Sequence, residues 1–158
     1  MTDNRKTFRH RISERLLLFI AEDGPIMETR KNRSLARSFR NAVKGLVFTY
    51  LSERNFRVEM AAFMLAVALG FLLGIDRLEW AILLLNSFLV LALEAKNTSL
   101  ELAVNLSIET YHYGVKGAKD AASGAVLLSA ISALLVGILI FVPRLILIAQ
   151  TLLGGRGR

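Results

Sequence analysis

Three long apolar runs without any charged residue constrain the fold of this chain more than any other feature. They cover residues 60–75, 80–93 and 121–142. The third run has 22 residues and meets the roughly 20 needed to cross a bilayer as a helix, and the other two reach that length with flanking polar residues. Lipid offers the backbone no hydrogen-bond partners, so spans of this length must be helical. The sequence predicts an all-α integral membrane protein with three transmembrane helices.

The charges outside these runs are distributed unevenly. The 158 residues carry 20 Lys and Arg against 13 Asp and Glu, and their net charge is +7. Thirteen of the basic residues precede Val58, which predicts a cytoplasmic N-terminus in a multi-pass protein. A basic N-terminus could also bind nucleic acid, but no recognition motif accompanies the arginines, so we expect no nucleic-acid partner. The chain has no cysteine, which excludes disulfides and thiolate zinc sites.

A fourth helix is predicted before the first span. Apolar residues recur at helical spacing and basic residues occupy the remaining surface, which is typical of an amphipathic helix at a membrane interface. Its apolar positions are Leu35, Phe39, Val43, Leu46 and Val47. Packing against protein alone is the alternative. We therefore divide the chain into a basic extension (1–33), a membrane domain (34–143) and a C-terminal tail (144–158).

A polar stripe interrupts the apolar pattern at the end of the second span. At about 100° per residue, its five members share one helical face. They are Glu94, Asn97, Thr98, Glu101 and Asn105. Lys96 projects roughly 200° away from Glu94 and cannot pair with it along the helix. Ionisable groups in such segments are expensive and usually functional, and a divalent cation is a good candidate to neutralise the two carboxylates.

Four motifs along the chain carry a family resemblance. They are Glu53-Arg-Asn-Phe-Arg57, Glu94-x-x-Asn97-Thr98-x-x-Glu101, Tyr111-His112 and Ala118-Lys119-Asp120-x-x-Ser123. Over residues 34–143 the chain resembles the prokaryotic diacylglycerol kinases and their undecaprenol kinase relatives. The resemblance implies a homotrimeric lipid kinase of the bacterial inner (cytoplasmic) membrane. Such a kinase transfers the γ-phosphate of ATP, with Mg²⁺, to diacylglycerol, giving phosphatidic acid, or to a polyprenol such as undecaprenol.

The resemblance also implies roles for single residues. Glu94 would be the general base, and Glu53 and Glu101 would hold Mg²⁺ together with the ATP phosphates. The nucleotide would be contacted by Asn97, Asn105, Lys119 and Asp120, and the lipid by Arg57 and Ser123. The chemistry is reasonable in itself, because phosphoryl transfer needs positioning, charge neutralisation and an acceptor for the hydroxyl proton. No Walker loop or protein-kinase signature is present.

Structural readings remain open for some of these residues. Glu53 could simply pair with Arg57 one helical turn on, and Lys119 and Asp120 could be ordinary loop charges. Family members usually carry aspartate where this chain has Asn105, and an apolar residue where it has Lys96. These departures leave a non-catalytic membrane scaffold as a second hypothesis. An ion-coupled transporter is weaker, since no inverted repeat is visible.

Overall fold

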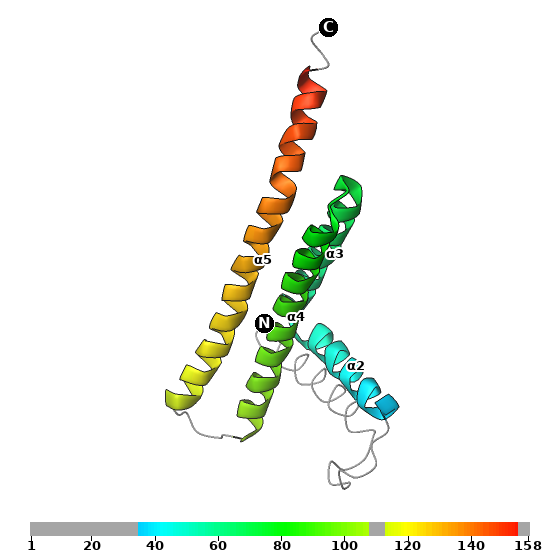
Figure 1. Cartoon of the computed structure of the whole chain (residues 1–158). Helices are drawn as coiled ribbons and strands as arrows, with labels where there is room; N and C mark the ends of the chain where they lie inside the picture. Colours follow the sequence, from blue (N-terminus) through cyan, green and yellow to red (C-terminus); the bar gives the residue numbers. More distant parts are fainter. Residues whose placement is uncertain (1–34, 108–112, 155–158) are drawn as a thin grey trace, which may run out of the picture. The chain divides into compact units, whose positions relative to one another are not determined.

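The computed structural model describes residues 35–107 and 113–154, with no account of the side chains of 106, 107 and 154. These residues form four helices and no strand: α2 (Leu35–Ser52), α3 (Arg54–Leu73), α4 (Arg77–Ser107) and α5 (Tyr113–Gly154) (Figure 1). The predicted all-α class is confirmed. The predicted extension 1–33 and the Tyr111-His112 motif lie outside the described residues. The chain divides into two units, Met1–Arg54 and Asn55–Arg158, and each is described by itself.

The first unit contains α2, the predicted amphipathic helix. Its apolar stripe is exposed along the helix, from 91% at Leu35 and 73% at Phe39 to 52% at Leu46. Near the C-terminal end, the Thr49 hydroxyl donates a hydrogen bond to the Gly45 carbonyl (3.0 Å). The helix and its exposed apolar face are therefore present as predicted, and its location at a membrane surface stays a prediction.

The second unit contains three helices that are long and apolar enough to cross a membrane, as the charge-free runs predicted. Their lengths are 20 residues for α3, 31 for α4 and 42 for α5. At 1.5 Å per residue, α4 and α5 extend for about 46 and 63 Å, beyond the roughly 30 Å hydrocarbon core. Charged residues mark where the hydrocarbon core ends, but the backbone hydrogen bonds of a helix can continue into the polar headgroup region. For this reason α5 runs unbroken past the predicted 143/144 domain boundary.

The turn between α3 and α4 follows directly from its residues. Gly74 adopts a left-handed φ of 60°, which a glycine reaches without a Cβ penalty, and the Ile75 amide bonds back to the Gly70 carbonyl (3.2 Å). The Glu79 amide donates to the Asp76 carboxylate (2.9 Å), and the Asp76 amide donates to the Glu79 carboxylate (2.8 Å). This reciprocal capping box starts α4.

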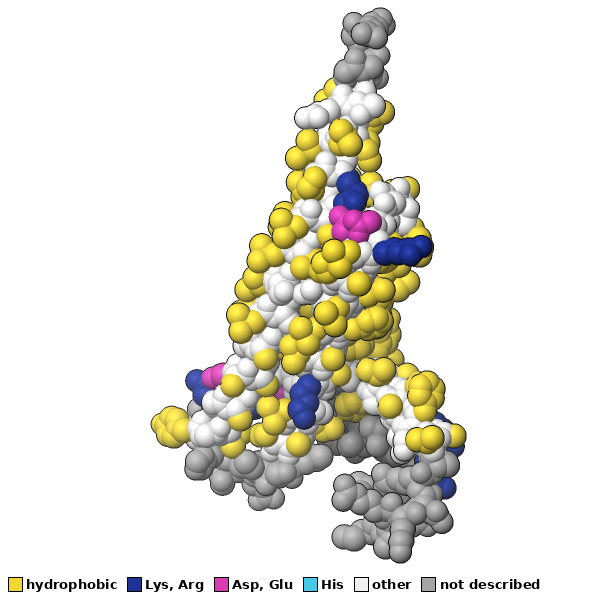
Figure 2. Space-filling view, in the orientation of Figure 1, with side chains coloured by type: hydrophobic (Ala, Val, Ile, Leu, Met, Phe, Trp, Pro, Cys, Tyr) yellow, Lys and Arg dark blue, Asp and Glu magenta, His cyan; other side chains and the backbone are white. Residues whose placement is uncertain are grey.

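The core of the second unit lies beside this turn. It consists of Ile75 and Leu83 packed against Ile140 and Phe141 of α5. Nearby, the Trp80 ring packs against Phe71, with ring centroids 4.8 Å apart and the ring planes tilted by 52°. Figure 2 shows hydrophobic side chains covering the face of these helices between charged groups at the two ends.

Polar contacts join α4 to α5 in the middle of the spans and near the turn. In the middle of the spans, the Ser132 hydroxyl donates to the Asn86 side-chain oxygen (2.8 Å). Near the turn, the Arg144 guanidinium makes a two-pronged ion pair with Glu79, at 2.7 Å through Nη1 and 2.6 Å through Nη2. Both contacts satisfy polar groups that lipid could not satisfy.

Close packing at Gly70 gives a test of this core. A Cβ added there would lie 2.7 and 2.9 Å from ring atoms of Trp80 and 3.1 Å from Ile75. We expect Gly70→Ala to destabilise the fold by about 1–3 kcal/mol, the usual range for overpacking. Thermal unfolding in detergent, followed by the fluorescence of the single tryptophan, measures the effect. Gly124→Ala is the control, because nothing lies within 4 Å of its added Cβ. Equal midpoints for the two variants would contradict this packing.

Candidate functional site

The second half of α4 carries the candidate site. Glu94 and Thr98 are buried, with exposed fractions of 3% and 6%. The Thr98 hydroxyl donates a hydrogen bond to the backbone carbonyl of Glu94 (2.9 Å). This bond lies within α4 and does not involve the Glu94 carboxylate. Since residues 94–105 belong to one continuous helix, the polar stripe expected from spacing does lie on a single helical face.

A second carboxylate stands close to this stripe. Glu59 of α3 is near enough to Glu94 for the two side chains to repel each other electrostatically, and its Oε2 atom is buried without a hydrogen-bond partner. We call these two residues the carboxylate pair. Glu59 is not among the site residues predicted from the sequence. Its position directly before the charge-free run 60–75 was the available signal, because a carboxylate there borders hydrocarbon.

Asn97 adds a further unsatisfied oxygen. It lies almost one helical turn after Glu94, and its Oδ1 atom is buried with no hydrogen-bond partner. Buried polar atoms without partners are rare and call for an explanation. Carboxylate and amide oxygens are the ligands that Mg²⁺ prefers. Glu59, Glu94 and Asn97 therefore suit a bound cation or a group rich in hydrogen-bond donors.

A metal ion at this site would need ligands beyond the protein. Among the residues that the structure describes, no three His, Cys, Asp or Glu side chains gather as a metal cluster. Mg²⁺ usually keeps several waters and binds through one or two carboxylates plus substrate phosphates, rather than in an all-protein cage. The oxygen-rich donor set therefore fits a magnesium–phosphate complex better than a metal ion alone.

The start of α5 contributes a cation to the same polar stripe. The Lys119 ammonium donates to the Asn105 side-chain oxygen (3.0 Å), which joins the first turns of α5 to the end of α4. Lys119 and Asp120 thus lie on a helix, not in a loop. Asp120 and Ser123 are exposed beside it. Because Asn105 is neutral, the contact leaves the positive charge of Lys119 without an anionic partner there.

The structure also gives the positions of three further predicted site residues. Glu101 is half-buried on the stripe, and Arg57 is exposed in the first turns of α3. Glu53 follows α2, and its amide donates to the Thr49 carbonyl (2.8 Å). It belongs to the first unit, so a site shared by Glu53 and Glu101 stays a prediction.

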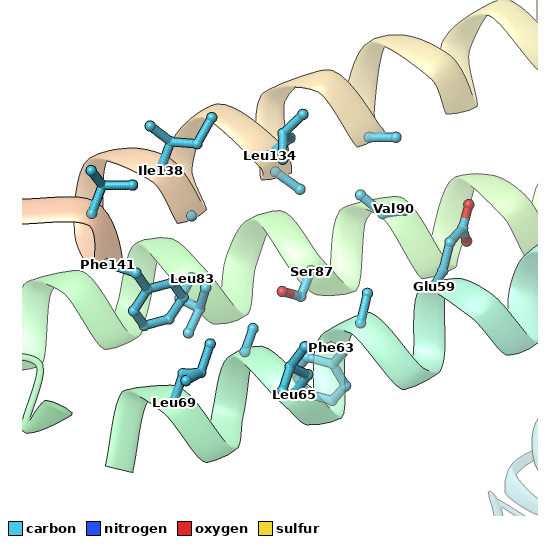
Figure 3. Close-up of a pocket in the computed structure, with 16 residues that line it drawn as sticks. Glu59, Phe63, Leu65, Leu69, Leu83, Ser87, Val90, Leu134, Ile138 and Phe141 are labelled. Atoms are coloured by element: carbon cyan, nitrogen blue, oxygen red, sulfur yellow. The ribbon is translucent and has the colours of Figure 1, made fainter. Parts of the chain in front are cut away.

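An apolar groove of about 420 Å³ leads to Glu59, one member of the carboxylate pair. In Figure 3, Glu59 lies at one end of the groove, Ser87 near its middle, and Leu69 and Phe141 toward the other end. All three spanning helices line it. Small residues of α5, namely Ala130, Ala133 and Gly137, leave room between the larger side chains. The groove can accept a long apolar molecule and present its polar end to Glu59.

Comparison with known proteins places the chain in a family context. Residues 40–141 match the family model for prokaryotic diacylglycerol kinase. A diacylglycerol kinase of Synechocystis is 40% identical over 114 residues, which are 72% of this chain and 65% of that protein. An undecaprenol kinase of Bacillus subtilis is 38% identical over 109 residues, 69% of this chain and 89% of that protein. The diacylglycerol kinase of Escherichia coli K12 is 34% identical over 92 residues, 58% of this chain and 75% of that protein.

Replacing a glutamate by glutamine should have opposite effects on thermal stability at the two ends of the bundle. Glu59→Gln removes a charge that is partly desolvated and repelled by Glu94, so we expect the thermal midpoint to rise. The rise should be on the order of 2–4 °C, which corresponds to about 1 kcal/mol for a chain of this size. Glu79→Gln removes the ion pair with Arg144, so we expect a lower midpoint. Unfolding curves of both variants in one detergent provide the measurement, and a lower midpoint for Glu59→Gln would refute the unfavourable placement of its charge.

Proposed function

Because this chain belongs to the prokaryotic diacylglycerol kinase family, we propose that it is an ATP- and Mg²⁺-dependent lipid kinase with diacylglycerol as its substrate. The relatives carry the names of two activities, diacylglycerol kinase and undecaprenol kinase. Both act on a lipid alcohol. Undecaprenol is therefore the alternative substrate for this chain.

The carboxylate pair at the end of the apolar groove is the observation that supports this proposal most directly. A lipid kinase must bring a hydroxyl from the membrane to a base and a phosphate. The groove is apolar along its length and reaches Glu59, beside Glu94. A lipid chain in the groove would remain surrounded by Leu, Phe and Ala side chains. Its hydroxyl would meet the carboxylates without the chain entering water.

Glu94 is the residue best suited to act as the base. Its side chain is buried on α4, so few water molecules compete with a lipid hydroxyl for the carboxylate. In the proposed step, the hydroxyl oxygen forms a bond to the γ-phosphorus while the bond to the β-phosphate oxygen breaks. The proton passes from the hydroxyl to Glu94, and ADP leaves. Glu59 lines the groove where the hydroxyl would arrive.

The nucleotide would lie along the polar stripe toward the ends of α4 and α5. Bound Mg²⁺ would neutralise phosphate charge and relieve the repulsion within the site. Glu101 and Asn97 offer oxygens for the cation, and Glu53 is a further proposed ligand. The Lys119 ammonium, held by Asn105, is a natural partner for phosphate. Asp120 would contact the nucleotide, while Arg57 and Ser123 would contact the lipid.

We also propose the bacterial inner membrane as the location, with a cytoplasmic N-terminus and a homotrimeric assembly. The excess of basic residues before Val58 supports the orientation. ATP is then available on the side where α4 ends and α5 begins. The trimer is carried over from the family resemblance, and native mass spectrometry of the detergent-solubilised protein would test it.

Phosphate transfer from ATP in mixed micelles tests the proposed activity, with diacylglycerol and undecaprenol offered in parallel. We expect transfer to diacylglycerol, and we expect Glu94→Gln to reduce kcat by about 10²–10⁴-fold, the usual contribution of a general base. Glu79→Gln serves as the matched control, because it changes a glutamate of the same helix at its other end. It should retain transfer at a temperature where the variant is folded.

Other outcomes of this assay are equally informative. Transfer to undecaprenol alone would replace the proposed substrate and keep the lipid kinase. No transfer to either lipid by folded protein would favour the non-catalytic scaffold. In that case Asn105→Asp, which supplies the charge typical of the family at this position, offers a direct attempt to restore activity.

Filling the groove tests whether it binds the lipid chain. A Cβ at Gly137 would meet no atom closer than Phe141 at 4.0 Å, so a larger side chain can extend into the groove without moving the backbone. We expect Gly137→Leu to raise KM for diacylglycerol about tenfold with a smaller change in kcat, as loss of uniform binding predicts. Leu139→Phe adds bulk at a position that is 74% exposed and outside the groove. Equal KM values for the two variants would argue against lipid in this groove.

A further inference from the structure

The C-terminal part of α5 forms an apolar surface that the proposed kinase site does not use. We call residues 145–154 the α5 tail. The family match ends at residue 141, before the tail begins. Figure 1 shows α5 continuing well past the turn between α3 and α4. Its large apolar side chains are 45–72% exposed: Leu145, Ile146, Leu147, Ile148, Leu152 and Leu153.

Charged groups mark where the membrane ends relative to the tail. Between Asp120 and Arg144, α5 has a charge-free run of 23 residues, which spans about 35 Å and matches a hydrocarbon core of roughly 30 Å. Arg144 pairs with Glu79, next to Trp80, a residue type that favours membrane–water interfaces. The polar boundary of the bilayer therefore lies at the Glu79–Arg144 ion pair, and the tail begins there.

A tail that continued straight along the membrane normal would not be covered by lipid. Its ten residues would extend about 15 Å beyond the boundary, whereas the headgroup zone on each side is only about 5–8 Å thick. Tilting the whole of α5 does not remove the mismatch, because its length of about 63 Å is twice the core thickness and helices tilt by roughly 20° on average. A straight tail would thus hold several Leu and Ile side chains in water.

The tail has the pattern of a helix that lies in the membrane surface. At 100° per residue, five large apolar side chains fall within an arc of about 160°. They are Leu145, Ile146, Ile148, Leu152 and Leu153. On the opposite side lie Gln150 and Thr151, with Leu147 between them, and Arg144 directly before the tail. Five of the six large apolar side chains thus share one side, and an interfacial helix buries such a side in the headgroup boundary by about 5–10 Å.

The residues at the start of the tail allow the required bend. Pro143 has no amide hydrogen, so α5 lacks the helical hydrogen bond to the Leu139 carbonyl, and proline is the commonest cause of helix kinks. Arg144 holds the preceding turn in place, since its guanidinium donates to the Ile140 carbonyl (2.8 Å) as well as to Glu79. The span is therefore tied to α4 up to this point.

The structure has α5 as one continuous helix. We propose that in a bilayer this helix bends at Pro143 and that the α5 tail lies in the plane of the bilayer surface. Its apolar face would contact the ends of the acyl chains, and its polar face would contact headgroups and water. The tail continues the lipid-facing surface of the same helix, so the lipid boundary is its partner rather than another protein. The proposal does not depend on the kinase activity.

Spin labels in proteoliposomes test this placement with the full chain. The protein has no cysteine, so single cysteines can be introduced at Leu145, Thr151 and Leu152, with Leu139→Cys as a reference within the span. Vesicles of phosphatidylcholine and phosphatidylglycerol would be exposed to oxygen, which partitions into lipid, and to a water-soluble nickel chelate. Leu145 and Leu152 share one face but lie seven residues apart, about 10 Å along the axis.

The proposal expects labels at Leu145→Cys and Leu152→Cys to favour oxygen and to report the same depth, while the label at Thr151→Cys favours nickel. A depth that changes by about 10 Å between the first two labels would show a straight tail and overturn the proposal. Preference for oxygen at all three positions would place the tail inside the hydrocarbon, and would also overturn it. So would shielding of Leu152→Cys from both reagents, which would indicate a protein partner or a second copy of the chain.

Discussion

The hydrocarbon core of a bilayer gives charged and polar groups no partners, and this constraint organises the whole second unit. It requires α3, α4 and α5 to satisfy their backbones as helices. It also moves nearly all charge to the two ends of the bundle, as Figure 2 shows. Within the spans, a polar side chain persists where it has a partner, as Asn86 has in Ser132.

The two ends of α4 meet this constraint in different ways. At the first end, Glu79 completes the capping box with Asp76 and accepts the Arg144 guanidinium, so its oxygens are used within the protein. Toward the other end, one carboxylate oxygen of Glu59 and the side-chain oxygen of Asn97 are buried without hydrogen-bond partners, and Glu59 is repelled by the like charge of Glu94. The first end stabilises the bundle. The second leaves polar atoms available for a ligand, which is the usual relation between a functional site and its scaffold.

The groove connects these two parts. Its walls come from the apolar faces of three helices, and the small side chains of α5 leave its open volume. Under the proposed function, a lipid chain would complete this packing while its hydroxyl meets the carboxylate pair. Binding and positioning would then arise from one arrangement, since the helices that hold the lipid also carry Glu59 and Glu94.

The sequence alone determined the all-α class, the three spans and the polar stripe of α4, because each depends on residues close together in the chain. Helical spacing and uncharged length are local properties. Only the tertiary structure showed that Glu59 stands beside Glu94, that Arg144 pairs with Glu79, and that Lys119 reaches Asn105. These contacts join residues 14 to 65 positions apart, and no local pattern specifies which faces of two helices meet. That choice is made by side-chain packing across the bundle.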